Sequence, residues 1–129
     1  MLRFIVGLQI VVGSLMLVCA AHAQEPWPNK PVRILVGFPA GTSTDIIARV
    51  YGQRLSEQFK RPFVIENRPG LGGNLAAQAA SKAPADGYTF LMATVANTIS
   101  ASVYKNLGYD FEQDFTPVAR LASAANVLV

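Results

Sequence analysis

Residues 32–45 read VRILVGFPAGTSTD, an apolar and β-branched run that ends in a turn of small residues. The run from Val32 to Phe38 is typical of a buried strand in a parallel sheet. After the proline, apolar residues recur at helical spacing from about Thr44 to Lys60, and Thr42 and Asp45 are placed as a capping box. This stretch predicts a strand, a tight turn and a helix.

The same order of elements repeats further along the chain. Residues 63–65 form a second apolar run, which continues through Glu66 into the turn NRPGLGGN at 67–74. An Ala-rich helix to Ala83 follows, with Asn74 as its expected N-cap. A third strand is expected from Tyr88 to Ala93, then a polar turn, a short helix and more strands. These later elements are placed at residues 94–100, 100–104, 118–121 and 127–129.

Strand, helix, strand, helix, strand is the pattern of an α/β fold whose parallel sheet carries helices on both faces. The strands of such a sheet end at one common edge, where ligands bind. Both glycine-bearing turns and the segment 94–100 follow strands, so all three are expected to meet there. The sequence therefore predicts a binding site at this edge.

The two glycine turns place backbone N–H groups at the starts of helices, where anions are attracted. The simpler alternatives are a well-capped loop for residues 39–45 and a flexible tight turn for Gly70 to Gly73. A dinucleotide site is disfavoured because the third glycine is misplaced, and the Gly-Lys-Ser/Thr ending of a phosphate-binding loop is absent.

Residues 1–23 have the form of a signal peptide. A basic start at Arg3 precedes an apolar run from 4 to 21, and Ala21-His22-Ala23 has the small-x-small form of a cleavage site before Gln24. A retained membrane anchor is the alternative. The sequence predicts export to the periplasm and a mature domain at residues 24–129.

Export would also remove Cys19 and His22, which are the only cysteine and histidine of the chain. The mature domain then has no disulfide, thiolate nucleophile, histidine base or Cys/His zinc site. The remaining acidic, lysine, tyrosine and serine side chains form no recognisable catalytic constellation, so no enzyme activity is expected. The mild, scattered positive charge disfavours a nucleic-acid surface.

Two charged features leave alternatives open. Asp110, Glu112 and Asp114 resemble calcium ligands in spacing, but a solvated turn anchored by Phe111 and Phe115 is favoured because no sharp-turn glycine is present. Arg68 is placed to pair with a ligand carboxylate, or within the chain with Glu66 or Asp45.

Five motifs together carry a resemblance to a known family. They are WPNKPVRI (27–34), FPAG (38–41) with Asp45 and Arg49, VIENRPGLGG (64–73), APADGYT (83–89) and YDFEQDFTPV (109–118). In order and spacing the chain resembles the extracytoplasmic solute-binding proteins of tripartite tricarboxylate transporters, the Bug family. The resemblance covers nearly all of residues 27–129.

The resemblance implies a type II periplasmic-binding-protein fold, of which residues 24–129 would be part of lobe I, truncated before lobe II. It implies capture of a carboxylated solute, delivery to membrane permease subunits, and no cofactor or metal. The expected ligand contacts are Pro39, Ala40, Gly41, Thr42, Ser43, Asp45, Gly70, Gly72, Gly73, Asn74 and Thr94. Side chains at 42–44 depart from the family's common second glycine after Gly41, and their hydroxyls add donors or bulk.

Two functions remain at this stage. Solute binding for a transporter predicts stabilisation by carboxylates, through backbone N–H groups at the two turns. A nonfunctional secreted remnant, or a small secreted α/β domain without a transport role, predicts no response to such ligands.

Overall fold

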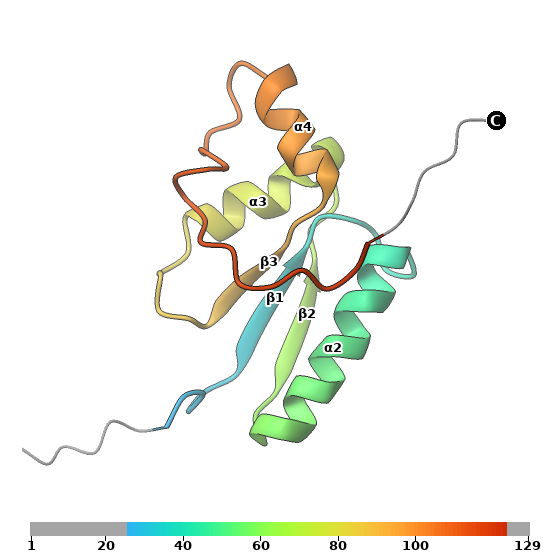
Figure 1. Ribbon diagram of the computed structural model, residues 1–129, viewed down its shortest axis with the longest axis vertical. Helices are drawn as coiled ribbons and strands as arrows, with labels where there is room; N and C mark the ends of the chain where they lie inside the picture. Colours follow the sequence, from blue (N-terminus) through green and yellow to red (C-terminus); the bar gives the residue numbers. More distant parts are fainter. Residues whose placement is uncertain (1–25, 124–129) are drawn as a thin grey trace, which may run out of the picture.

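The computed structural model describes residues 26–123. Three parallel strands form one sheet in the order β2-β1-β3, and the helices connect them (Figure 1). Along the chain the elements are β1 (Val32–Val36), α2 (Ser43–Phe59), β2 (Phe63–Asn67), the short 3-10 helix η1 (Leu71–Gly73), α3 (Asn74–Ser81), β3 (Thr89–Met92) and α4 (Val95–Val103). The predicted α/β architecture is confirmed. The predicted signal peptide and the strand at 127–129 lie outside the described residues.

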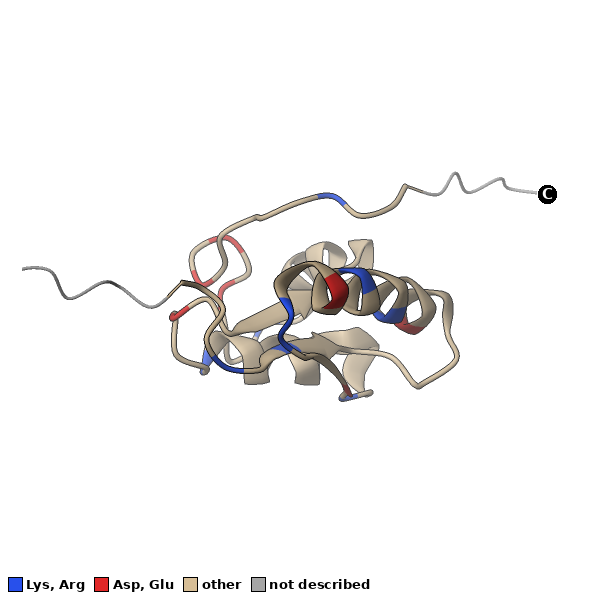
Figure 2. Ribbon diagram, turned by 90° about the horizontal axis from the view of Figure 1, so that it is seen from below, with Lys and Arg blue, Asp and Glu red and all other residues tan. Residues whose placement is uncertain are grey.

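The sheet separates two packed layers. β1 is central, and its register pairs Ile34 with Ile65 of β2 and with Phe90 of β3. Helix α2 packs on β1 and β2, whereas α3 packs on β1 and β3. The crossover through α2 runs from β1 to β2, and the crossover through α3 runs back from β2 to β3. Because the two crossovers run in opposite directions across the sheet, right-handed connections place the helices on opposite faces, as Figures 1 and 2 show.

The core on the α2 face follows from strand periodicity. Val32, Ile34 and Val36 point to one side and form a buried cluster with Ala48 and Phe63. Leu35 points to the other side and is buried too. On that side, Ala76 and Ala77 of α3 are fully buried. Burial of each large aliphatic side chain stabilises the fold by about 1.5–3 kcal/mol. Because β1 supplies buried side chains to both faces of the sheet, it is the centre of the core.

An aromatic cluster closes the amino end of the sheet. The ring of Trp27 meets Phe59 edge-on at 5.3 Å and Phe63 at 6.4 Å between centroids. Tyr88 lies 6.2 Å from Trp27 and carries Lys30 over its ring at 4.3 Å. These contacts place the lead-in segment at the end of the sheet opposite the two glycine turns.

The predicted caps were wrong in detail. Thr42 is the N-cap of α2, but its Oγ1 donates to the carbonyl of Pro39 at 2.8 Å and makes no capping bond. Asp45 accepts from the N–H of Gly41 instead of closing a capping box. Helix α3 is preceded by Gly73 as its N-cap, so Asn74 is its first residue, with a buried side chain, and the helix ends at Ser81.

The later part of the chain differs from the prediction at two places. Helix α4 starts directly after Thr94, so residues 94–100 are not a polar turn followed by a separate helix. Val95, Ile99 and Val103 already stand four residues apart, which is helical spacing. Residues 118–121 form no strand, and the carbonyl of Leu121 instead accepts a hydrogen bond from the Tyr51 hydroxyl at 3.1 Å.

The acidic loop is a solvated turn, as favoured. Oδ1 of Asp110 accepts the N–H groups of Glu112 and Gln113 at 2.9 and 3.0 Å. The ring of Phe115 packs against Tyr109 and Phe111. Within residues 26–123 no group of three acidic, His or Cys side chains is placed to hold a metal ion. No helix in that same range is long and apolar enough to cross a bilayer.

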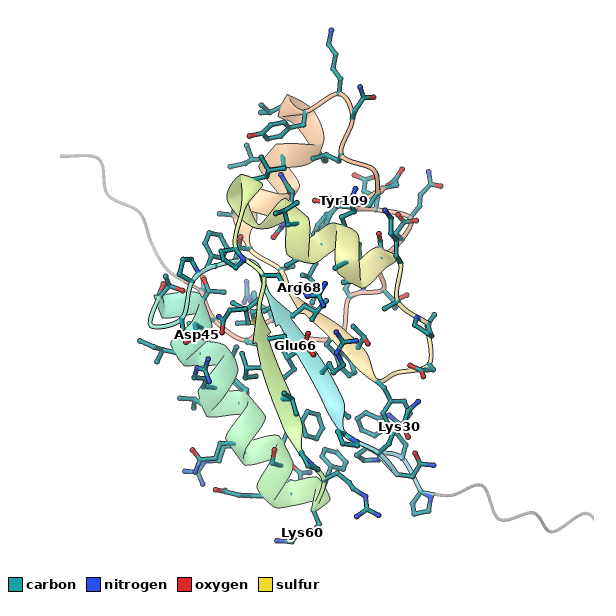
Figure 3. The ribbon with its side chains drawn as sticks, turned by 180° about the vertical axis from the view of Figure 1, so that it is seen from behind. Lys30, Asp45, Lys60, Glu66, Arg68 and Tyr109 are labelled. Atoms are coloured by element: carbon teal, nitrogen blue, oxygen red, sulfur yellow. The ribbon has the colours of Figure 1, made fainter. Side chains whose placement is uncertain are left out.

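Charged residues of both signs are spread along α2 (Figure 2). One such pair is Arg54 and Glu57, whose Nη1 and Oε2 are 3.2 Å apart. On the other face of the sheet, Arg33 of β1 makes a two-pronged bond to Glu66 of β2, at 2.5 and 2.8 Å. Arg68 joins the same carboxylate at 3.5 Å, so it pairs within the chain (Figure 3).

Candidate functional site

The two glycine turns touch each other at the carboxyl edge of the sheet. Gly37, directly after β1, lies against Gly73 so closely that a Cβ built on Gly37 would be 2.4 Å from the Cα of Gly73. The backbone N–H of Arg68 also donates to the carbonyl of Val36 at 2.8 Å. The predicted convergence of the turns is confirmed, and two glycines make it possible.

Within residues 26–123, the first turn leaves backbone N–H groups at the start of α2 without a hydrogen-bond partner. The first helical hydrogen bond runs from the N–H of Ile46 to the carbonyl of Thr42, at 2.9 Å. The N–H groups of Ser43, Thr44 and Asp45 therefore precede the helical ladder, at the positive end of the helix dipole. Since Thr42 turns its hydroxyl toward Pro39, it does not cap them. An anion is the natural partner for such donors.

Gly41 holds the backbone shape of this turn. Its φ of +86° lies in the left-handed region, which other residues rarely adopt. Its own N–H donates to Oδ2 of Asp45 at 2.9 Å, so it points into the fold. A Cβ at Gly41 would meet nothing within 4 Å, which leaves the outer side of the turn open.

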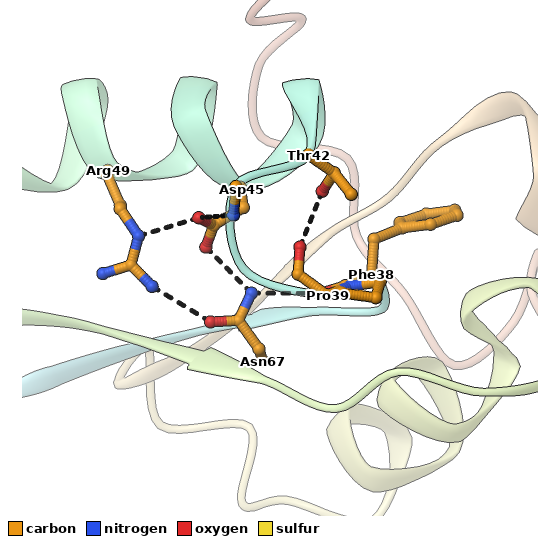
Figure 4. Close-up of polar contacts among 7 residues, drawn as sticks. Phe38, Pro39, Thr42, Asp45, Arg49 and Asn67 are labelled. Atoms are coloured by element: carbon orange, nitrogen blue, oxygen red, sulfur yellow. Dashed lines mark hydrogen bonds and ion pairs between the residues drawn. The ribbon is translucent and has the colours of Figure 1, made fainter.

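A polar cluster lies directly behind this turn (Figure 4). Oδ2 of Asp45 accepts from Nε of Arg49 at 2.8 Å, and Oδ1 accepts from Nδ2 of Asn67 at 2.8 Å. Asn67 also donates to the carbonyl of Phe38 at 3.0 Å and accepts from Nη2 of Arg49 at 3.0 Å. Asp45 is 1% exposed. The hydrogen bond from Arg49, with those from Gly41 and Asn67, holds the pKa of this carboxyl far below its usual range.

The backbone of the second turn has positive φ at four consecutive residues. Positive φ values run from Gly70 (137°) through Leu71 (49°) and Gly72 (65°) to Gly73 (92°). Leu71 is the unusual member, because a side chain at positive φ is strained, and such strain is common at functional sites. The N–H of Gly73 bonds inside the turn to the carbonyl of Gly70 at 3.0 Å. A Cβ at Gly72 would meet nothing within 4 Å, so this turn is open on its outer side as well.

A second polar network lies beneath the second turn. Asn74, at 3% exposure, donates from Nδ2 to Oγ of Ser100 at 2.9 Å and accepts from the Tyr109 hydroxyl at 2.8 Å. Burial raises the pKa of Tyr109. Asn74 thus joins α3, α4 and the loop at Tyr109, and its side chain is engaged inside the fold.

Thr94 ends the segment after β3 and starts α4. Its N–H donates to Oδ1 of Asn97 at 2.9 Å. This bond fixes the orientation of the Asn97 amide, because a flipped amide would set two donors against each other. The Nδ2 of Asn97 is buried without a hydrogen-bond partner among the described atoms. A Cβ on Gly73 would lie 3.5 Å from it, so α4 is in close contact with the second turn.

Sequence reasoning identified the turns but missed four supporting residues: Gly37, Arg49, Asn67 and Asn97. Arg49 had a usable signal, because it stands four residues after Asp45 in the predicted helix, and so did Asn67. Asn67 alternates with Phe63 and Ile65 along β2 and therefore faces α2. Gly37 lies inside an apolar run, and its contact with Gly73 depends on two segments far apart in sequence.

The comparisons with known proteins point to one family. Residues 47–129 match the family model of the tripartite tricarboxylate transporter family receptor. A UPF0065 protein of Bordetella bronchiseptica is 43% identical over 101 residues, which cover 78% of this chain and 30% of the relative. The chain belongs to the tripartite tricarboxylate transporter receptor family. BugT of Bordetella pertussis is 32% identical over 114 residues, covering 87% of this chain and 35% of that protein.

Solved structures of relatives share the fold. Rpa4515 of R. palustris, determined with adipate, is 46% identical with a TM-score of 0.65, over 71% of this chain and 31% of that one. MatC of Rhodopseudomonas palustris, with bound malate, is 32% identical with a TM-score of 0.65, over 74% of this chain and 33% of that one. Members of the receptor family are periplasmic solute-binding proteins of transporters. The chain spans about a third of the length of the relatives it matches.

Proposed function

We propose that this chain captures a carboxylated small molecule for a tripartite tricarboxylate-type transporter, at the edge where its two glycine turns touch. The contact between Gly37 and Gly73 carries this proposal, because it brings the end of β1, which leads into the first turn, against the second turn. Relatives that bind adipate and malate support the choice of carboxylates as ligands.

In this proposal the ligand carboxylate accepts hydrogen bonds from the backbone N–H groups at the start of α2. Oriented N–H groups at a helix start bind anions without a lysine or arginine in the site. The residues that form the surface are Pro39, Ala40, Gly41, Thr42, Ser43, Gly70, Gly72 and Thr94, and Gly73 is buried between the two turns. Asp45 and Asn74 lie behind this surface, since their side-chain atoms bond within the fold.

The hydroxyls at 42–44 tune the site. Ser43 is exposed and Thr44 is half-buried at the start of α2. Their hydroxyls add donors beside the backbone N–H groups, which suits a ligand with several oxygen atoms. The Thr42 hydroxyl is engaged with Pro39 and contributes less.

The transport setting follows from the family. We infer that residues 1–23 act as a signal peptide, that the protein works in the periplasm, and that membrane permease subunits receive the ligand. Binding proteins of this kind close two lobes on the solute, and the described residues supply one wall of such a cleft. On its own this wall is expected to bind weakly, because only part of the ligand surface is covered.

The alternative is a secreted α/β domain without a transport role. The two functions are separated by thermal-shift measurements of the chain with adipate and malate, and with the neutral diamide of adipate as control. Binding to the folded state stabilises it by RT ln(1 + L/Kd), where L is the free ligand concentration, so the unfolding midpoint rises as ligand is added. A rise with the acids but not with the diamide supports capture of a carboxylate. Equal midpoints with all three compounds, at the highest soluble ligand concentration, would rule it out.

A further inference from the structure

The cluster of Asp45, Arg49 and Asn67 is the most complete polar arrangement near the site. Asp45 uses both carboxylate oxygens inside the fold, and its side chain is almost fully buried. A ligand therefore has no free oxygen of Asp45 to meet. The cluster must act on the site through the backbone that it holds.

Each bond of the cluster fixes a different segment. The bond from Gly41 N–H to Asp45 holds the first turn against α2. The bond from Asn67 to the Phe38 carbonyl holds the end of β1 against the end of β2. The bond between Asn67 and Asp45 joins these two contacts at 2.8 Å. One side chain from β2 thus connects the strand end, the turn and the helix start.

The charges of the cluster matter because a ligand carboxylate is expected close by. A buried unpaired carboxylate behind the turn would repel an anion. Arg49 lies 2.8 Å from Asp45 through Nε and offsets this charge, while about half of its side chain faces solvent. The Asp45–Arg49 pair behind the turn is therefore close to neutral, and the N–H groups at the start of α2 remain the groups that attract the ligand carboxylate.

We propose that Asp45, Arg49 and Asn67 are positioning residues that set the shape of the first glycine turn for ligand binding without touching the ligand. By drawing the Gly41 N–H inward, the cluster leaves the N–H groups of Ser43 and Thr44 directed to the ligand. This inference rests on the proposed function. The loss of Asp45 also distinguishes two origins of ligand affinity. If net positive charge attracts the ligand, affinity should rise when Asp45 is replaced, whereas if oriented N–H donors bind it, affinity should fall.

The test uses Asp45→Asn and Asn67→Ala in the isotope-labelled chain, titrated with adipate and followed by NMR of the backbone amides. Asp45→Asn adds one unit of positive charge, so a charge-driven site would bind adipate more tightly. We expect the opposite, an affinity about tenfold lower, because asparagine cannot accept all the hydrogen bonds that Asp45 accepts. Asn67→Ala is expected to weaken binding to a similar extent.

Glu57→Gln is the matched control. It makes the same charge change on the same helix, in a surface pair with Arg54 that lies away from both turns. Its affinity for adipate should stay within about twofold of the original chain. If Asp45→Asn binds as tightly as Glu57→Gln or more tightly, the positioning role is overturned.

A second reading comes from the ligand-free spectra. Hydrogen bonding to a carboxylate gives the Gly41 amide slow hydrogen exchange, and the amide should lose this protection in Asp45→Asn while the remaining spectrum stays dispersed. Unchanged protection of Gly41 would overturn the inference even if binding changes. If the original chain binds no carboxylate at all, the proposed function fails, and the Gly41 amide still decides whether the cluster sets the turn.

Discussion

Gly37 and Gly73 are in direct backbone contact, although 36 positions separate them in the numbering. The carbonyl oxygen of Gly73 would lie 2.8 Å from a Cβ on Gly37, and its Cα would lie closer still. No side chain fits between the two turns at this point. The contact is what makes one site out of two separate strand ends.

Gly37→Ala is expected to push the turns apart. Gly37 has no left-handed φ, so the alanine is not strained by its own backbone, and the cost comes from overlap with Gly73. Overpacking of this kind costs about 1–3 kcal/mol in the free energy of unfolding. Urea denaturation measures this loss, and adipate binding should weaken in parallel.

Gly52→Ala is the control for that change. Gly52 lies inside α2, where alanine stabilises the helix by up to about 1 kcal/mol relative to glycine. A Cβ on Gly52 would meet the flexible end of the Ile65 side chain of β2 at 3.0 Å. A stability near or above that of the original chain is expected. If Gly37→Ala proves as stable as Gly52→Ala, the close contact of the turns is incorrect.

Gly41→Ala and Gly72→Ala should separate binding from folding. Both glycines have left-handed φ, and a Cβ at either position points into open space. The backbone strain costs about 1–2 kcal/mol, which leaves the chain folded. Adipate binding should be lost, because the new methyl groups stand where the ligand approaches.

Gly87→Ala supplies the same strain elsewhere, since Gly87 has a φ of +78° and lies beside Trp27 at the far end of the sheet. Thermal shift with adipate compares the three variants at matched folded fraction. Binding that survives in Gly41→Ala and Gly72→Ala would show that the ligand sits elsewhere.

Acid should destabilise the chain partly through Asp45. Its pKa is lowered by Arg49 first, and also by Gly41 and Asn67. The pKa of an aspartate in an unfolded chain is about 3.9, so the stability from Asp45 is complete above that pH and is lost as the pH falls toward the folded pKa. Denaturation at a series of pH values should show a steeper loss of unfolding free energy in acid for the original chain than for Asp45→Asn.

The carboxyl groups of Glu66 and Asp86 are present in both proteins and do not affect this comparison. Their pKa values are lowered too, mainly by Arg33 and by Lys30 respectively. Parallel pH curves would contradict this role of Asp45.

Tyr109→Phe tests the network beneath the second turn. Loss of the hydroxyl leaves the buried Oδ1 of Asn74 without its donor, which costs about 1–3 kcal/mol of unfolding free energy. Tyr51→Phe removes a surface hydroxyl bonded to Leu121 and should change stability by no more than about 0.5 kcal/mol. Chemical denaturation of both variants gives the comparison. Equal effects would show that the Asn74 contact adds nothing.

Strand β1 and helix α2 could be predicted because their signals are local. The apolar run at 32–36 and the helical spacing after Thr44 need no distant partner. The Thr42 cap failed because its hydroxyl had a competing acceptor at Pro39, which depends on the turn shape. Residues 118–121 have strand-like composition, yet a strand also needs a neighbour to pair with, and composition does not supply one.

The site was predictable only as far as its backbone. Glycines after strands indicate an edge where ligands bind, and the structure brings both turns there. The supporting cluster was not predictable, because the bond between Asn67 and Asp45 requires the placement of α2 over β2. The family resemblance gave Asp45 as an expected ligand contact, and the structure shows that its side chain bonds within the fold.

The central claim is that a carboxylate binds where the two glycine turns touch. An amide NMR titration of the labelled chain with adipate tests it most directly, with the neutral diamide as control. We predict saturable shifts of the Ser43, Thr44 and Gly72 amides with adipate alone, while amides near Trp27 at the opposite end stay unchanged. Shifts spread evenly over the surface, or identical responses to the diamide, would contradict the claim.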